Sequence, residues 1–287
     1  MQTIAHIINV TEINESKLGS YLHIAQPMTM KSMAIAKAMA TGVVNVDLVA
    51  VKHHGETVDI PPEIAAEFQW APNLEKYAWE YIQPLHTVEP HKPLPRLHDI
   101  IHALYQHSKA DYFIYTNLDI GLYPDFYLRI AALIQEGYDA ICVNRIDLPK
   151  EAYGVLIDDN HFELALTLSG QRHQGIDCFV FKRSMVPKLK LGNVYIGFPP
   201  VGQVLKTQIE SNAQKFVWIT EETLTFHIGR DNAWKHSQSP YRQENMTQAE
   251  GLYIPCLGKN RPKTPLNRRV IGKIKGMIKH SLSSPKC

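Results

Sequence analysis

The chain has 287 residues and a formal net charge of +2, with 45% hydrophobic and 20% charged residues. These values are ordinary for a soluble globular protein with a sizeable core, and no stretch approaches the roughly 18 apolar residues of a membrane span. The four cysteines lie far apart without CxxC spacing, so we expect reduced thiols rather than a disulfide framework or a zinc site. The first residues lack the basic start and long apolar core of a signal peptide, which predicts a cytoplasmic location.

In the first half of the chain, apolar runs that predict strands alternate with segments that predict helices. Strands are expected at 4–10, 46–52, 112–116 and 139–146, and helices at 28–42, 96–108 and 125–138, with a short helix after Pro61-Pro62. Residues 71–95 contain five prolines and are expected to be irregular. This alternation is typical of an α/β fold with a mostly parallel sheet and helices on its faces.

The second half is less regular. Strands are expected at 178–183 and 215–220, and a helix at 199–214. The segment "ETLTFHIGRDNAW" is expected to end the compact region, and no clean boundary precedes about residue 237. We therefore predict one domain over 1–237 and a C-terminal extension over 238–287.

The extension carries a strong positive charge. Residues 259–287 contain nine Lys or Arg and no acid, which leaves 21 basic against 28 acidic residues elsewhere. Within 267–280 the apolar residues share one helical face, and a basic amphipathic helix can lie in an anionic lipid interface. We predict peripheral binding to an anionic membrane; a terminal helix packed on the domain and a disordered tail are the alternatives. No aromatic residues are interleaved with the charges, so no nucleic-acid partner is expected.

A carboxylate follows the buried run 112–116. Asn117 and Asp119 are two residues apart, so in an extended segment their side chains point to the same side. Amide and carboxylate oxygens can hold Mg²⁺ or Mn²⁺ together with phosphate oxygens, and ligands of open α/β sheets bind beyond the carboxyl ends of the strands. The alternative is that Asp119 only caps the turn before Gly121 through an Asx-type hydrogen bond.

The order of helix 96–108, apolar run Tyr112–Thr116 and "NLD" at its end resembles the glycosyltransferases of the GT-A fold, which use nucleotide-sugar donors. The resemblance implies a Rossmann-related mixed sheet and a metal-assisted hexosyl transfer from a nucleotide-diphosphate sugar to a glycan or lipid-linked hydroxyl. In that family the last acid of a "DxD" signature binds the metal that bridges the donor diphosphate, which implies this role for Asp119. The first acid contacts ribose or metal-bound water; here it is Asn117, which removes one negative charge and weakens metal binding.

The resemblance also implies a second ligand from "TFHIGR". His227 is expected to bind the metal or diphosphate, since a neutral imidazole is an acceptable Mn²⁺ ligand. Arg230 is expected to face the diphosphate leaving group, where a cation stabilises the developing charge. The alternative for His227 is a hydrogen-bonded histidine at a strand end.

Further residues follow from the same resemblance. Asp177, before the apolar run 178–183, corresponds to an acceptor-side carboxylate, which acts as general base in an inverting enzyme or binds hydroxyls in a retaining one. The alternative is a solvated acid, and His173 is a weaker candidate in the same segment. Thr11 and Glu12 are expected to contact the nucleotide base and ribose, and Arg96 is expected to meet a phosphate.

Other enzyme classes lack their motifs. The sequence contains neither GxxxxGK[ST] nor GxSxG, and Asn117 cannot be the nucleophile of a haloacid-dehalogenase-type phosphatase. The alternative that remains is not an active enzyme: a GT-A-like domain that keeps sugar or nucleotide binding at a membrane and has lost transfer.

Overall fold

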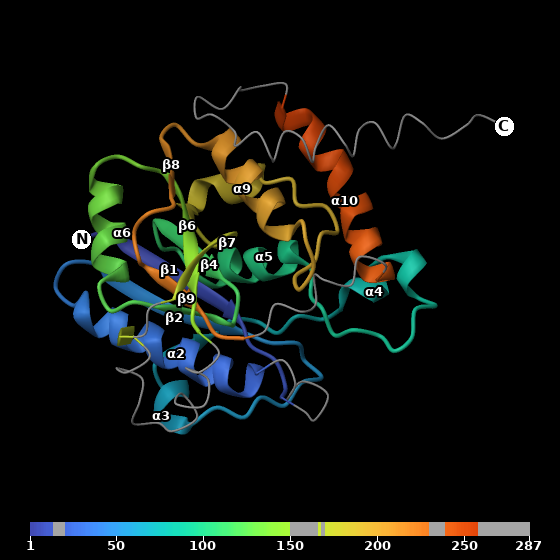
Figure 1. Ribbon diagram of the computed structural model, residues 1–287, viewed down its shortest axis with the longest axis horizontal. Helices are drawn as coiled ribbons and strands as arrows, with labels where there is room; N and C mark the ends of the chain where they lie inside the picture. Colours follow the sequence, from blue (N-terminus) through green and yellow to red (C-terminus); the bar gives the residue numbers. More distant parts are fainter. Residues whose placement is uncertain (14–20, 150–165, 168–169, 230–238, 258–287) are drawn as a thin grey trace.

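The computed structural model describes residues 1–13, 21–149, 166–167, 170–229 and 239–257. They form one nine-stranded sheet with helices on both faces (Figure 1). The strands are β1 Thr3–Asn9, β2 Asn45–Val51, β3 Phe68–Trp70, β4 Tyr112–Thr116, β5 Ile120–Leu122, β6 Ala140–Asp147, β7 Gln171–Lys182, β8 Phe216–Ile219 and β9 Thr225–His227. The helices are α2 Leu22–Met39, α3 Pro62–Ala65, α4 Ala78–Tyr81, α5 Leu97–His107, α6 Phe126–Gln135, α9 Val201–Asn212 and α10 Pro240–Leu257, with 3-10 turns η1 Gln83–Leu85 and η3 Arg183–Lys188.

The strand order is β3-β2-β1-β4-β7-β6-β9-β5, and β8 also pairs with β6. The parallel pairing of β1 with β2 and β4 is what the alternation of strands and helices predicts. The sheet as a whole is mixed rather than mostly parallel, because β7 enters between β4 and β6 in the antiparallel direction. This mixed sheet is the form that the GT-A resemblance implies.

Each face of the sheet has its own apolar core. One core packs the apolar sides of α2 and α6 against the strands, and the other packs α5 and α9 against the opposite side. Figure 1 shows these two helix layers above and below the sheet. Because both faces are covered, the central strands β1 and β4 are mostly apolar, and polar side chains gather where the strands end.

Several elements differ from the sequence-based expectation. The short strand β5 lies where only a turn was expected, and α4 lies within 71–95, which was expected to be irregular. The helix expected over 28–42 begins at Leu22 and contains Pro27, because Ile24, Ala25 and Met28 pack against Phe226 and its neighbours. β3, at the edge of the sheet, was not expected. β7 begins at residue 171 rather than 178, because its first half is polar and gives no apolar run.

The compact region also extends beyond residue 237, where we expected it to end. In α10 the side chains of Tyr241, Asn245 and Ala249 are buried. Asn245 bonds the backbone of Tyr195 in both directions, accepting from its N–H at 3.1 Å and donating to its carbonyl oxygen at 3.1 Å. The basic segment 259–287 and its expected helix over 267–280 lie outside the described residues. Within the described part of the chain, no helix is long and apolar enough to cross a membrane.

Gly121 fixes a close approach of β5 to β9. A Cβ atom at this position would lie 2.3 Å from Cζ of Phe226. Gly121 belongs to β5, which follows Asp119 and pairs with β9 along its whole length. We expect Gly121→Ala to lower the free energy of unfolding by about 1–3 kcal/mol through overpacking, measured by urea denaturation. Gly251→Ala in α10 is the matched control, because a Cβ there meets nothing within 4 Å. Equal stability of the two variants would contradict this account of Gly121.

Candidate active site at the carboxyl end of β4

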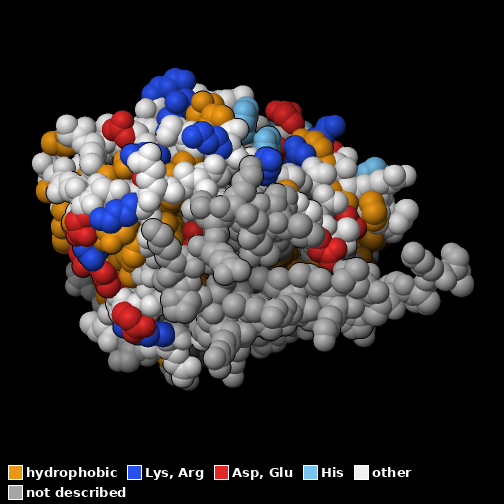
Figure 2. Space-filling view, turned by 90° about the horizontal axis from the view of Figure 1, so that it is seen from above, with side chains coloured by type: hydrophobic (Ala, Val, Ile, Leu, Met, Phe, Trp, Pro, Cys, Tyr) orange, Lys and Arg blue, Asp and Glu red, His pale blue; other side chains and the backbone are white. Residues whose placement is uncertain are grey.

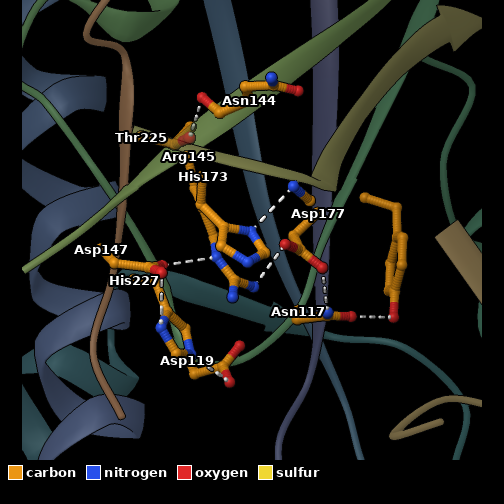
Figure 3. Close-up of polar contacts among 11 residues, drawn as sticks. Asn117, Asp119, Asn144, Arg145, Asp147, His173, Asp177, Thr225 and His227 are labelled. Carbon is orange, nitrogen blue, oxygen red and sulfur yellow. Dashed lines mark hydrogen bonds and ion pairs between the residues drawn. The ribbon is translucent and has the colours of Figure 1, made fainter. Parts of the chain in front are cut away.

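The polar side chains that we singled out meet where β4 ends. Asn117 and Asp119 follow β4, Asp177 comes from β7 and His227 ends β9; Figure 3 shows them converging with residues of β6. The site therefore lies beyond the carboxyl end of a central strand, where open α/β sheets bind their ligands.

Asn117 and Asp119 do not lie in the extended segment that we expected. The N–H of Ile120 donates to the carbonyl oxygen of Asn117 at 3.1 Å and closes a turn. As a result the two side chains have different partners. Asn117 accepts a hydrogen bond from the Tyr115 hydroxyl at 2.8 Å and donates to Oδ1 of Asp177 at 3.0 Å.

Asp119 faces His227 instead. Its Oδ2 lies 3.3 Å from Nε2 of His227, and Nδ1 of the same imidazole lies 3.4 Å from Oδ1 of Asp147 on β6. The imidazole is thus held between two carboxylates (Figure 3). The other oxygen of Asp119, Oδ1, is buried and has no hydrogen-bond partner among the described residues.

Arg145 joins the two halves of the site. Its side chain is only 6% exposed; Nε donates to Asp147 at 2.8 Å and Nη1 donates to Oδ2 of Asp177 at 2.6 Å. Contacts therefore run without a break from Tyr115 through Asn117, Asp177, Arg145, Asp147 and His227 to Asp119 (Figure 3).

A β-bulge orients Asp177. On β6, Val143 pairs with Cys178 and the next residue, Asn144, pairs with Ile176, so Asp177 has no opposing residue. A bulge of this kind turns a side chain out of the regular alternation of the strand and is common beside active sites. Asp177 therefore lies inside the long strand β7. The sequence had indicated a position before the strand, and this expectation is wrong.

The charges of the site shift its ionisation. Burial alone would raise the pKa of Asp119, but the charge and hydrogen bond of His227, with the charge of Arg145, outweigh burial and lower it. Burial also opposes ionisation of Asp147, yet His227 and Arg145 bring its pKa to about 2. For His227 burial would lower the pKa, but Asp119 and Asp147 raise it to about 10. At neutral pH the centre therefore holds carboxylates around an imidazolium and a guanidinium.

This ionisation predicts how stability depends on pH. The pKa of His227 rises from 6.5 to about 10 on folding, so its contribution is complete below pH 6.5 and is lost as the pH rises toward 10. We expect wild-type protein without divalent cations to lose stability between pH 7 and pH 9.5, measured by urea denaturation at each pH. His227→Gln should lack most of this slope. Parallel pH profiles of the two proteins would contradict the ion-pair arrangement.

The residues present fit a divalent cation that is coordinated mainly by phosphate oxygens of a bound molecule and only in part by the protein. Among the described residues, no group of three or more His, Cys, Asp or Glu is arranged to hold a metal ion. Mg²⁺ and Mn²⁺ sites that bind phosphates, however, use few protein ligands. The buried Oδ1 of Asp119, which has no partner among the described residues, and the Nε2 of His227 could serve as two such ligands. Asp147 at Nδ1 supplies the outer carboxylate that orients a metal-binding imidazole. Binding at Nε2 must displace a proton, so cation affinity should rise with pH.

Other expected site residues are less central. Thr11 lies at the end of β1, as expected, but its Oγ1 donates to Glu56 at 2.5 Å and its N–H to Gln26 at 2.8 Å. Glu12 is half-buried beside it. Arg230 lies outside the described residues.

Arg96 is occupied by protein partners. It forms a bidentate pair with Asp99 at 2.9 and 2.8 Å, donates to Asn193 at 2.8 Å, and stacks 3.3 Å above the ring of Tyr81. A phosphate contact by Arg96 stays a prediction. His173 lies near Asp177, and its Nδ1 accepts a hydrogen bond from the N–H of Gly175 at 2.8 Å.

Arg145 and Asp147 were not among the site residues expected from the sequence. The signal was present in "NRID", where polar residues end an apolar strand in the same way as "NLD" ends β4. The β6 strand was expected. Its polar end could not be assigned to the site, because the sequence does not indicate that β7 pairs with β6.

Comparison with known proteins gives the fold. No protein-family model matches the chain, and no curated protein matches it in sequence. Among solved structures, S. aureus TarS 1-349 in complex with UDP-GlcNAc is 11% identical with a TM-score of 0.51, over 92% of this chain and 68% of that one. A longer S. aureus TarS structure has a TM-score of 0.48, and this chain spans 41% of it.

A second similar structure is glucosyl-3-phosphoglycerate synthase from Mycobacterium tuberculosis in complex with Mn²⁺, UDP and glucosyl-3-phosphoglycerate. It is 15% identical, with a TM-score of 0.47 over 92% of this chain and 83% of that one. At these identities the likeness shows the fold alone. The chain has the GT-A fold that its sequence resembles.

Proposed function

We propose that this chain is a glycosyltransferase that moves a hexose from a nucleotide-diphosphate sugar to a hydroxyl acceptor. The observation that carries the proposal is the pairing of Asp119 with His227 at the end of β4, with Oδ1 of Asp119 buried and unpartnered among the described residues. A carboxylate oxygen that has no partner among the described residues suits a cation brought in with a diphosphate. UDP and Mn²⁺ are bound by the structurally similar synthase, and UDP-GlcNAc by TarS.

The residues divide into a donor side and an acceptor side. Asp119 and His227 would hold Mn²⁺ or Mg²⁺, and such a cation, when bound, neutralises charge on the diphosphate leaving group. Asp177 is the candidate acceptor base or hydroxyl-binding group on the other side. Arg145 and Asn117 hold its two oxygens and favour its ionised form, which is the form that accepts a proton.

The acceptor and the location are parts of the same proposal. We propose a glycan or lipid-linked acceptor and action at the cytoplasmic face of a membrane, with residues 259–287 binding anionic lipid and Arg230 facing the leaving group. The support is the charge of that segment, nine basic residues without an acid.

The second candidate is a binding module without transfer activity. Its support is Asn117, which stands where the family usually has an acid and uses its amide within the protein. An aspartate there would place a second carboxylate 3.0 Å from that of Asp177, so asparagine suits this particular site. The neighbouring Asp177 therefore accounts for the asparagine, and a loss of transfer activity is not needed to explain it.

A panel of nucleotide-sugars separates the two candidates. The protein is incubated with UDP-, GDP- and TDP-sugars and Mn²⁺, and released nucleotide is measured, with EDTA as the control. A transferase should hydrolyse one donor slowly with water as acceptor, and EDTA should stop it. A donor that raises Tm without nucleotide release would favour the binding module. If no donor is hydrolysed or raises Tm, both candidates fail.

A further inference from the structure

A groove lies outside the site, between α5 and the chain that follows η3. Its volume is about 280 Å³, close to the lower limit of roughly 300 Å³ for small-molecule sites. It is lined by His98, Ile101, His102, Tyr105, Val186, Pro187, Leu189 and Leu191. Five of the eight are aliphatic or proline, so the floor of the groove is apolar.

The polar side of the groove is built by α5. His98 and His102 are one turn apart, and their rings stack at 5.5 Å with an interplanar angle of 11°. Asp99 lies beside them: its Oδ1 is 3.2 Å from Nδ1 of His98, and Arg96 pairs with the same carboxylate through two hydrogen bonds. The groove therefore has imidazoles and no uncompensated carboxylate at this end.

The chain on the other side of the groove carries positive charges next to its apolar lining residues. Residues 183–209 contain no Asp or Glu, while Lys188 and Lys190 alternate with the lining residues Pro187, Leu189 and Leu191. Both lysines are exposed, and neither forms an ion pair within the described part of the chain. Long lysine side chains can bring their ammonium groups to the rim of an apolar surface. Lys or Arg, histidine and hydrophobic side chains lie together along one edge of the face in Figure 2.

We infer that this groove binds an anionic amphiphile, an acyl chain with a phosphate headgroup, as found in a membrane lipid. The acyl chain lies on the apolar floor between Ile101 and Leu189, and the phosphate meets Lys188 and Lys190. An apolar floor beside unpaired cations matches that chemistry at both ends. The chain's own segment 259–287 is not the occupant, because its nine basic residues would be repelled by these lysines. This binding needs no sugar donor and stands apart from the proposed transfer activity.

The test compares three probes on the full chain: dodecyl phosphate and dodecyl maltoside, each below its critical micelle concentration, and inorganic phosphate. Calorimetric titration should give an affinity for dodecyl phosphate at least tenfold above that for either other probe. Perturbed imidazole resonances in NMR spectra of the same samples, absent in a His98→Gln/His102→Gln variant, should place it at the groove. Equal affinity for dodecyl maltoside would overturn the headgroup assignment, and equal affinity for inorganic phosphate would overturn the acyl assignment. No binding of dodecyl phosphate would overturn the inference as a whole.

Variants locate the site independently. Leu189→Glu places a charge on the floor and should lower dodecyl phosphate affinity at least tenfold, while Val43→Glu, at a side chain that is already 49% exposed, should not change it. Lys188→Gln/Lys190→Gln should lower dodecyl phosphate affinity and leave dodecyl maltoside binding unchanged. On vesicles of equal parts phosphatidylglycerol and phosphatidylcholine, Leu189→Glu should bind more weakly than wild type, since both keep residues 259–287. Unchanged affinity in both groove variants would overturn the inference.

Discussion

Asp119→Asn is expected to abolish Mn²⁺-dependent binding and hydrolysis of the donor. The substitution keeps the size of the side chain but removes the negative charge that faces His227, and with it the charge that Oδ1, unpartnered among the described residues, would offer to the cation. A lost charge-stabilising group in an active site costs roughly 100-fold or more in rate. We expect nucleotide release to fall by at least that factor, measured with the best donor of the panel and saturating Mn²⁺.

The matched control is Asp125→Asn, which makes the same chemical change at an exposed residue beside α6. It should keep wild-type activity. Thermal unfolding of both variants checks that Asp119→Asn is folded, which we expect because His227 retains Asp147 as a partner. Wild-type Mn²⁺ dependence in folded Asp119→Asn would remove Asp119 from the metal site.

Arg145→Met is expected to lower the free energy of unfolding by about 3–5 kcal/mol. The guanidinium is 6% exposed and is bonded to both Asp147 and Asp177. Removing one partner of a buried ion pair leaves an uncompensated charge. The free-energy cost of that charge is larger than the net stabilisation that the intact pair provides. Urea denaturation at pH 7 measures the effect.

Arg129→Met is the control for a surface arginine that also donates two short hydrogen bonds to carboxylate oxygens, here both of Glu222. Arg129 bonds Glu222 at 2.7 and 2.8 Å, but the two side chains are 35% and 41% exposed, so the loss should be at most about 1 kcal/mol. Adding Asp177→Asn to Arg145→Met should restore part of the stability, because it removes one unpaired charge. Equal losses for Arg145→Met and Arg129→Met would show that burial does not govern the Arg145 contacts.

Much of the fold follows from apolar patterning. The strands β1, β2 and β4 and the helices α5 and α6 have continuous apolar runs or faces, and the structure confirms them within a few residues. The first half of β7 could not be predicted in this way, because residues 171–177 are mostly polar and are held by backbone pairing with β6. α10 was missed because its burial depends on α9 and the Tyr195 region, which lie far away in the sequence.

The site was predictable only in part. Asp119 and His227 were expected to meet, and they do at 3.3 Å. The turn at Asn117 and the bulge at Asp177 were not predictable, because both depend on tertiary pairing rather than on local spacing. Arg145 was missed for the same reason: its partners come from different strands.

The central claim is that Asp119 and His227 hold the donor's cation. Anomalous diffraction from Mn²⁺ in crystals grown with UDP locates that cation directly. We predict one strong peak in contact with Oδ1 of Asp119 and Nε2 of His227, with the diphosphate on its open side. A nucleotide bound without Mn²⁺, or a peak held by other residues, would contradict this account of the site.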